Sequence, residues 1–211
     1  MNQLITALGL ALAHLTTLAQ APNQLVVPAL PSSASATAAS APTFARVQVL
    51  GSLEPTLDLG CIAGSQVLPT HAPPDLFLAA FRCVMTDQFD RAARLMTIAQ
   101  AFGQFDVARL TDRTVAAGPT VLARRMVGQV PREKLTALLT ATRAAEASAA
   151  LNAELCADLQ RVGPPAYYPR YLVLHGLAAA SGQSTPENSL KASFDGPAYW
   201  AAYLKGAVRC P

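Results

Sequence analysis

Charged residues are scarce in this sequence, and none of them lies before Arg46. They make up 14% of the 211 residues, against about a quarter in an average domain. The net charge of +3 is too small to indicate a nucleic-acid-binding protein, because such proteins concentrate Lys and Arg on one face. The sequence also lacks a series of apolar runs of about 20 residues, which excludes a polytopic membrane protein. Apolar residues still make up 52% of the chain, and this excludes a wholly disordered protein.

The common catalytic and metal-binding motifs are absent as well. There are only three histidines, and no His-Glu-x-x-His, which excludes the helical zinc-protease site. No Gly-x-Ser-x-Gly and no Gly-x-x-x-x-Gly-Lys occurs, so neither a nucleophile elbow nor a phosphate-binding loop is indicated. No Cys-x-x-Cys occurs, so neither a thioredoxin-like redox site nor a zinc knuckle is indicated. The sequence therefore predicts no catalytic residue, no metal site and no cofactor, and it favours a binding protein over an enzyme.

The uncharged N-terminal part predicts export. Residues 4–18 are rich in Leu and Ala, and their length is typical of the apolar region of a signal peptide. Small residues follow at Ala19 and Ala21, so we expect residues 1–21 to be a signal peptide and the protein to be periplasmic or secreted. Met1-Asn2-Gln3 lacks the usual basic residue. This leaves three alternatives: a misplaced start, a weak anchor, or a buried helix of a cytosolic protein.

Residues 22–42 predict a linker. They contain four prolines among Ala, Ser and Thr, with no charged or aromatic residue. Such a composition is typical of a flexible tether. We therefore expect a disordered Ala/Ser/Pro-rich linker ahead of a single domain at 43–211.

The domain is expected to be all-α, a compact array of about six to eight helices. Apolar residues recur at helical spacing in several segments, and no segment alternates with the period of a strand. Helices are expected after Asp75, at 89–102, from Gly103 to Gly118-Pro119, around 135–142 and from 151 to Gly163, with short helices beginning at Pro186 and Pro197. The similar segments 88–92 and 104–108 leave open a helix–turn–helix repeat within residues 75–119. Four aspartates among arginines are expected to form a solvated, ion-paired face: Asp87, Asp90, Asp106 and Asp112.

The four cysteines support export. All lie in the domain, and in an oxidising compartment they allow three pairings. Pairing of nearest neighbours predicts disulfides Cys61–Cys83 and Cys156–Cys210, the second of which would hold the C-terminal end of the chain. Four buried free thiols are the alternative.

Aromatic residues with polar groups gather beyond Pro165. All five tyrosines and the single tryptophan lie there, with Arg170 and His175 among them. Tyr, Trp and Arg are the residues that most often anchor protein interfaces. We therefore predict a binding site, although the same residues could instead belong to the core. The predicted site consists of Tyr167, Tyr168, Arg170, Tyr171, His175 and Trp200.

These observations favour one function over two alternatives. The favoured hypothesis is an exported helical protein that binds another protein of the cell envelope or extracellular space, as an inhibitor or accessory factor. The first alternative is an enzyme of unknown reaction type that uses His175. The second is a helical-repeat scaffold on residues 75–119.

Overall fold

The computed structural model of the protein describes residues 49–211, and this part of the chain is all-α, as predicted. The expected signal peptide (1–21) and linker (22–42) lie outside the described residues. Nine α-helices, rather than six to eight, occur in residues 49–211, because three are single turns of four residues. No helix in this part combines the length and apolarity needed to cross a membrane. The α-helices are α2 (Pro73–Met85), α3 (Phe89–Arg109), α4 (Gly118–Gln129), α5 (Arg132–Ala147), α6 (Ala149–Val162), α7 (Arg170–Val173), α8 (Leu177–Ala180), α9 (Pro186–Ser189) and α10 (Gly196–Tyr203).

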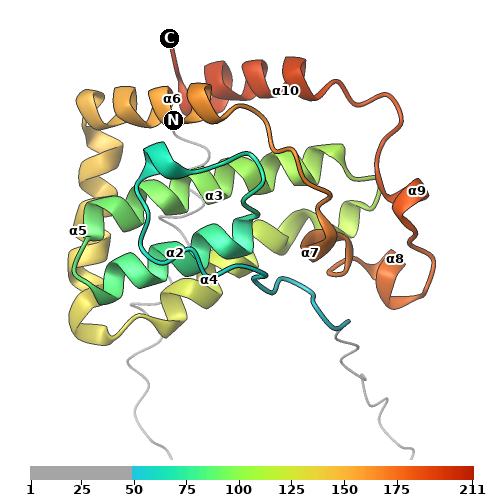
Figure 1. The fold of residues 1–211 in the computed structure, drawn as a ribbon, viewed down its shortest axis with the longest axis horizontal. Coiled ribbons are helices and arrows are strands. Elements are labelled where there is room, and N and C mark those ends of the chain that lie inside the picture. The colour runs from blue at the N-terminus through green and yellow to red at the C-terminus, as the bar shows by residue number, and fades with distance from the viewer. Residues whose placement is uncertain (1–48) are drawn as a thin grey trace, which may run out of the picture.

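Helix α3 is the centre of the array. It packs against α2, α4, α5, α6 and α10 (Figure 1). Helix α5 stands across one end of α2 and α3, whereas α7, α8 and α9 lie at the opposite end. Two 3-10 helices, η1 (Gly64–Gln66) and η2 (Arg113–Ala117), and a π-helical turn, η3 (Leu204–Val208), complete the elements. The buried core follows the apolar faces of α2 and α3 at helical spacing, as the sequence predicts.

Asp75 stabilises the start of α2, although not as the residue before the helix. It is the third residue of α2 and accepts a hydrogen bond from the Ala72 backbone N–H at 3.3 Å. Its other oxygen accepts the backbone N–H groups of Thr56 at 2.7 Å and Leu57 at 2.9 Å. A buried carboxylate that accepts several N–H groups at a helix start is stabilised by the helix dipole. Asp75 thereby holds the segment that precedes η1 against α2.

Two glycines expected to end helices act differently. Helix α3 continues through Gly103. The absence of a side chain at this residue lets α4 approach α3, since a Cβ atom here would lie 2.9 Å from the Cβ of Pro119. Gly118-Pro119 begins α4 instead of ending a helix, in keeping with the preference of proline for the first helical turn. Residues 89–109 therefore form one helix, so the similar segments 88–92 and 104–108 lie at the two ends of a single helix and not in successive helices. Helix α9 begins at the predicted Pro186, and α10 begins at Gly196, one residue before the predicted Pro197.

Both predicted disulfides are confirmed. Cys61 pairs with Cys83, which joins the segment before η1 to α2. Cys156 pairs with Cys210, which joins α6 to the end of the chain just beyond η3. No free cysteine remains in the described part of the chain. The first bond fixes the segment before η1, and the second fixes the segment after η3.

Candidate functional site

The structure divides the predicted aromatic site into buried and exposed residues. Tyr171 and Trp200 are each only 5% exposed and belong to the core, which is the alternative left open for these residues by the sequence. Tyr167 and His175 are half-buried. Only Tyr168, at 38% exposure, and Arg170 lie at the surface.

Tyr167 and Tyr171 are held by a buried carboxylate that the sequence analysis placed in solvent. Asp106 has no exposed surface and accepts hydrogen bonds from both hydroxyl groups, at 2.8 Å from Tyr167 and 2.7 Å from Tyr171. The Arg109 guanidinium lies 2.7 Å from its other oxygen. Burial raises the pKa of Asp106 to about 6, against the opposing effects of Arg109 and the two tyrosines. Asp106 lies four residues after Phe102, on the buried face of α3, and this spacing was the signal that could have revealed it.

Trp200 is buried because α10 packs over the end of α3. Its ring meets Phe102 and Phe105 edge to face, with centroids 5.8 and 5.9 Å apart. Such pairs are favourable beyond the apolar area that they bury. The aromatic cluster beyond Pro165 thus attaches the C-terminal elements to α3.

His175 has one polar neighbour but no acidic partner. Its Nδ1 lies 3.4 Å from the Oγ of Ser52, which is buried. Burial lowers the pKa of His175, and the nearby charge of Arg125 lowers it further. His175 also lines neither of the two cavities described below. The enzyme hypothesis needs a histidine general base that is held by a carboxylate. Residues 49–211 do not form this arrangement around His175.

A large open cavity lies between α3, α5, α6 and η3. Its volume is about 830 Å³, which is within the range of pockets that hold small organic ligands. The sequence analysis did not predict it, because its walls come from helices far apart in the chain and carry no motif. A smaller cavity of about 370 Å³ lies beside η2 and α9.

Small side chains create the large cavity. Ala93, Thr97 and Ala101 follow one another at one-turn spacing along α3. Ala137 and Ala141 do the same on α5. Neighbouring helices lie 8–10 Å apart when their side chains interdigitate, and short side chains on facing helices leave space between them. The cavity is therefore a consequence of the alanine-rich composition, about a fifth of the chain.

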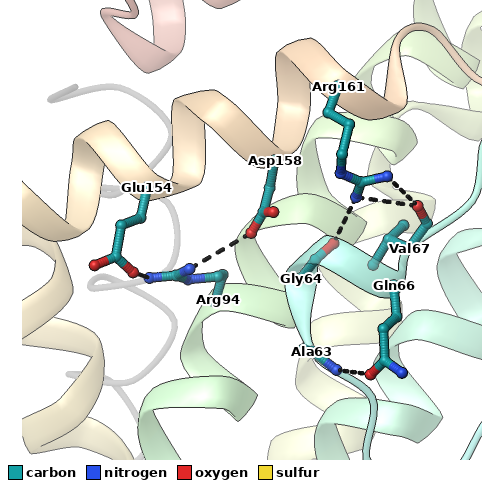
Figure 2. A network of polar contacts seen from close by, with 8 residues as sticks. All are labelled: Ala63, Gly64, Gln66, Val67, Arg94, Glu154, Asp158 and Arg161. Atoms are coloured by element: carbon teal, nitrogen blue, oxygen red, sulfur yellow. Dashed lines mark hydrogen bonds and ion pairs between the residues drawn. The ribbon is translucent and has the colours of Figure 1, made fainter.

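A network of polar contacts closes the cavity at the η1 end (Figure 2). Arg94, in the cavity wall, forms ion pairs with Glu154 and with Asp158, the latter at 3.5 Å. Arg161 donates hydrogen bonds to the backbone carbonyls of Gly64 at 2.9 Å and Val67 at 3.3 Å. These contacts tie α6 to both α3 and η1, so the wall of the cavity is fixed on this side.

Gly64 is required for this network. A Cβ atom at residue 64 would lie 2.1 Å from the Oδ2 of Asp158 and 2.9 Å from the Cδ of Arg94. Any larger residue would therefore displace the Asp158 carboxylate or the segment that contains η1.

Tyr203 forms part of the opposite wall. It is the last residue of α10, and its ring lies near those of Tyr199 and Trp200, with centroids 6.2 and 6.1 Å away. Its hydroxyl oxygen is buried but has no hydrogen-bond partner among the described residues. Ala207 and Val208 of η3 extend this wall, and the Cys156–Cys210 disulfide attaches its end to α6.

Comparisons with protein-family models, with curated proteins and with solved structures found no match to this chain.

Proposed function

We propose that this chain is an exported binding protein that holds an apolar ligand in the cavity between α3, α5, α6 and η3. The observation that carries the proposal is the cavity itself, an open space of about 830 Å³ whose wall combines small and apolar side chains of α3, α5, α6 and η3 with five charged residues. Apolar walls with a few polar groups are typical of small-molecule sites, because burial of the ligand's apolar surface provides most of the affinity.

Two further features support this function. Cys61–Cys83 and Cys156–Cys210 are compatible with an oxidising compartment, where disulfides persist. The uncharged segment before Arg46 fits an exported chain. Neither feature depends on the cavity, so export and ligand binding are tested separately.

The binding proposal is tested by filling the cavity. Ala145 of α5 is half-buried in the cavity wall, whereas Ala147, at the end of the same helix, is exposed and lies outside it. We expect the uncharged probe diphenylhexatriene to fluoresce with the wild-type domain and with Ala147→Trp. An indole at residue 145 occupies the cavity, so Ala145→Trp should reduce probe affinity at least 10-fold.

Two results would contradict the binding proposal. One is absence of probe binding by the folded wild-type domain. The other is an equal loss of binding in both variants, which would show that the probe does not occupy the cavity. Circular dichroism of each variant establishes that it remains folded.

A second candidate function is binding of a protein at the α7 end. The exposed residues here are Leu50, at 87% exposure, Tyr168 and Arg170. The Nη1 of Arg170 lies beside Gly51, so Arg170 and Leu50 share one surface. Tyrosine and arginine with an adjacent apolar side chain are a common composition of interface anchors. This candidate retains the two residues of the predicted aromatic site that are exposed.

A further inference from the structure

The α7 end of the protein carries the two most exposed large apolar side chains of residues 49–211. Leu50 is 87% exposed, and Leu177, the first residue of α8, is 68% exposed. Figure 1 shows α7, α8 and the start of the described chain at the end of the array opposite α5. Single exposed leucines are common on protein surfaces, so the charged residues around these two decide what the face can bind.

Two arginines lie near the segment that presents Leu50. The Nη1 of Arg170 lies beside the residue that follows Leu50, 3.2 Å from the position of a Cβ atom there. The next residue, Ser52, has its Oγ 3.4 Å from the Nδ1 of His175. Arg125 of α4 is close enough to His175 for its charge to lower the pKa of the imidazole. Both arginines are exposed, so their guanidinium groups and Leu50 are available to one partner.

The cations of this face have no counter-ion among the described residues. Residues 49–54, 112–129 and 169–180 form the face, and they contain four arginines and two carboxylates. The arginines are Arg113, Arg124, Arg125 and Arg170. None of them forms an ion pair with any of residues 49–211. Residues 1–48 contain no Asp or Glu, so the preceding chain has no carboxylate to offer them.

The two carboxylates do not balance this charge. Asp112 accepts the backbone N–H groups of Thr114 at 2.9 Å and Ala178 at 3.1 Å, and these contacts hold α8 to η2. Glu54 is exposed and forms no ion pair with a described residue. The α7 end therefore combines protruding aliphatic side chains with an excess of unpaired positive charge.

We propose that the α7 end docks on an anionic lipid bilayer, with Leu50 and Leu177 among the headgroups and Arg125 and Arg170 against the lipid phosphates. Basic residues are attracted to an anionic bilayer, and apolar side chains add affinity when they leave water. The two leucines belong to separate segments, and a bilayer accepts such side chains without a pocket for each, whereas a protein partner must provide one. This docking goes beyond the binding of a ligand in the cavity and does not depend on it.

Co-sedimentation with lipid vesicles tests the proposal. The protein used is the chain from Gln20, the start expected after export. It should bind vesicles of equal parts phosphatidylglycerol and phosphatidylcholine at least 10-fold more tightly than vesicles of phosphatidylcholine alone. Raising NaCl from about 0.1 M to about 1 M should release it, because the Debye length falls from about 10 Å to about 3 Å.

A double variant assigns the binding to this face. Arg125→Gln with Arg170→Gln should weaken binding to the anionic vesicles about 10- to 30-fold, since one basic residue beside such a bilayer is worth roughly 5-fold in affinity. The matched control is Arg132→Gln with Lys205→Gln, which removes the same net charge from exposed residues of α5 and η3. This control should weaken binding by no more than about 3-fold, because its charges lie outside the docking face.

A second pair of variants tests the apolar contact. Leu50→Gln should weaken binding to the anionic vesicles about 5-fold, because the side chain no longer gains by leaving water. Met85→Gln is the control, an exposed apolar residue at the end of α2 whose backbone carbonyl faces Lys134 of α5. Binding by this variant should equal that of the wild-type chain.

Every other result counts against the docking of lipid. Equal binding to both kinds of vesicle, or equal losses in the two double variants, would overturn the role of this face. Absence of binding to the anionic vesicles by a chain that circular dichroism shows to be folded would overturn the proposal altogether. If a protein is then cross-linked to the wild-type chain and lost in Tyr168→Ala, the face binds protein instead. Diphenylhexatriene binding reports on the cavity separately, so failure of either proposal leaves the other standing.

Discussion

At the scale of single residues, neighbouring tyrosines of the aromatic cluster have opposite roles. Tyr171 is buried and donates to Asp106, whereas Tyr168 is exposed and its hydroxyl lies 2.8 Å from that of Ser189. Tyr171→Ala should destabilise the fold by about 3–5 kcal/mol, because it leaves a cavity and a carboxylate with one donor fewer. Tyr168→Ala should lower stability by about 1 kcal/mol or less. Urea unfolding of the two variants measures the difference.

The same pair tests the second candidate function. If the α7 end is an interface, Tyr168→Ala should reduce cross-linking of a partner from envelope extract while the fold stays intact. Equal loss of stability in both variants would place Tyr168 in the core and remove this candidate.

Sequence reasoning failed at this scale for a physical reason. It placed Tyr171 and Trp200 in a predicted binding site, with the core as the alternative, and it placed Asp106 in solvent because carboxylates are rarely buried. Burial of Asp106 became favourable only when Tyr167 and Tyr171 reached it from 61 and 65 residues away and joined Arg109, one turn along the same helix. Helical spacing places Asp106 on the buried face of α3, but it does not show which donors will reach it.

At the scale of elements, periodicity predicted most helices and misplaced two boundaries. The apolar spacing of α2, α3, α5 and α6 is local information, and it was sufficient. Glycine and proline usually interrupt helices, so the sequence predicts helix ends at Gly103 and at Gly118-Pro119. Their function here depends on the contact between α3 and α4, which is not local. The cavity was missed for the same reason, since spacing shows where the alanines of α3 and α5 lie on each helix but not that the two faces border one space.

The C-terminal elements should depend on the Cys156–Cys210 bond. It spans 54 residues and attaches the cavity wall formed by η3 to α6. Replacing both cysteines by alanine should lower the unfolding free energy by about 2–4 kcal/mol. It should also weaken diphenylhexatriene binding, because Tyr203, Ala207 and Val208 are then less firmly held. Thermal unfolding and probe titration measure the two effects. Probe binding that survives unchanged would show that η3 keeps its place without the bond.

At the scale of the whole molecule, export predicts where the chain is found and where it begins. Cell fractionation of a C-terminally tagged chain should place it in the periplasm or the medium. N-terminal sequencing should find a start near Gln20 or Pro22, because small residues suitable for cleavage precede both. Peptide mapping without reductant should recover both disulfides. An uncleaved cytosolic chain with four alkylatable thiols would contradict export.

The order of the disulfides along the chain has a consequence for how the protein matures. The first cysteine pairs with the second and the third pairs with the fourth, so the two covalent loops neither overlap nor enclose one another. In a chain that emerges from a translocation channel N-terminus first, Cys83 is the first thiol that Cys61 meets, and Cys210 meets Cys156 after the first bond has closed. Oxidation in order of emergence therefore produces the native pairing out of the three possible ones. In the exported chain that we propose, this order of oxidation reaches the native pairing without the slow reshuffling of wrong bonds.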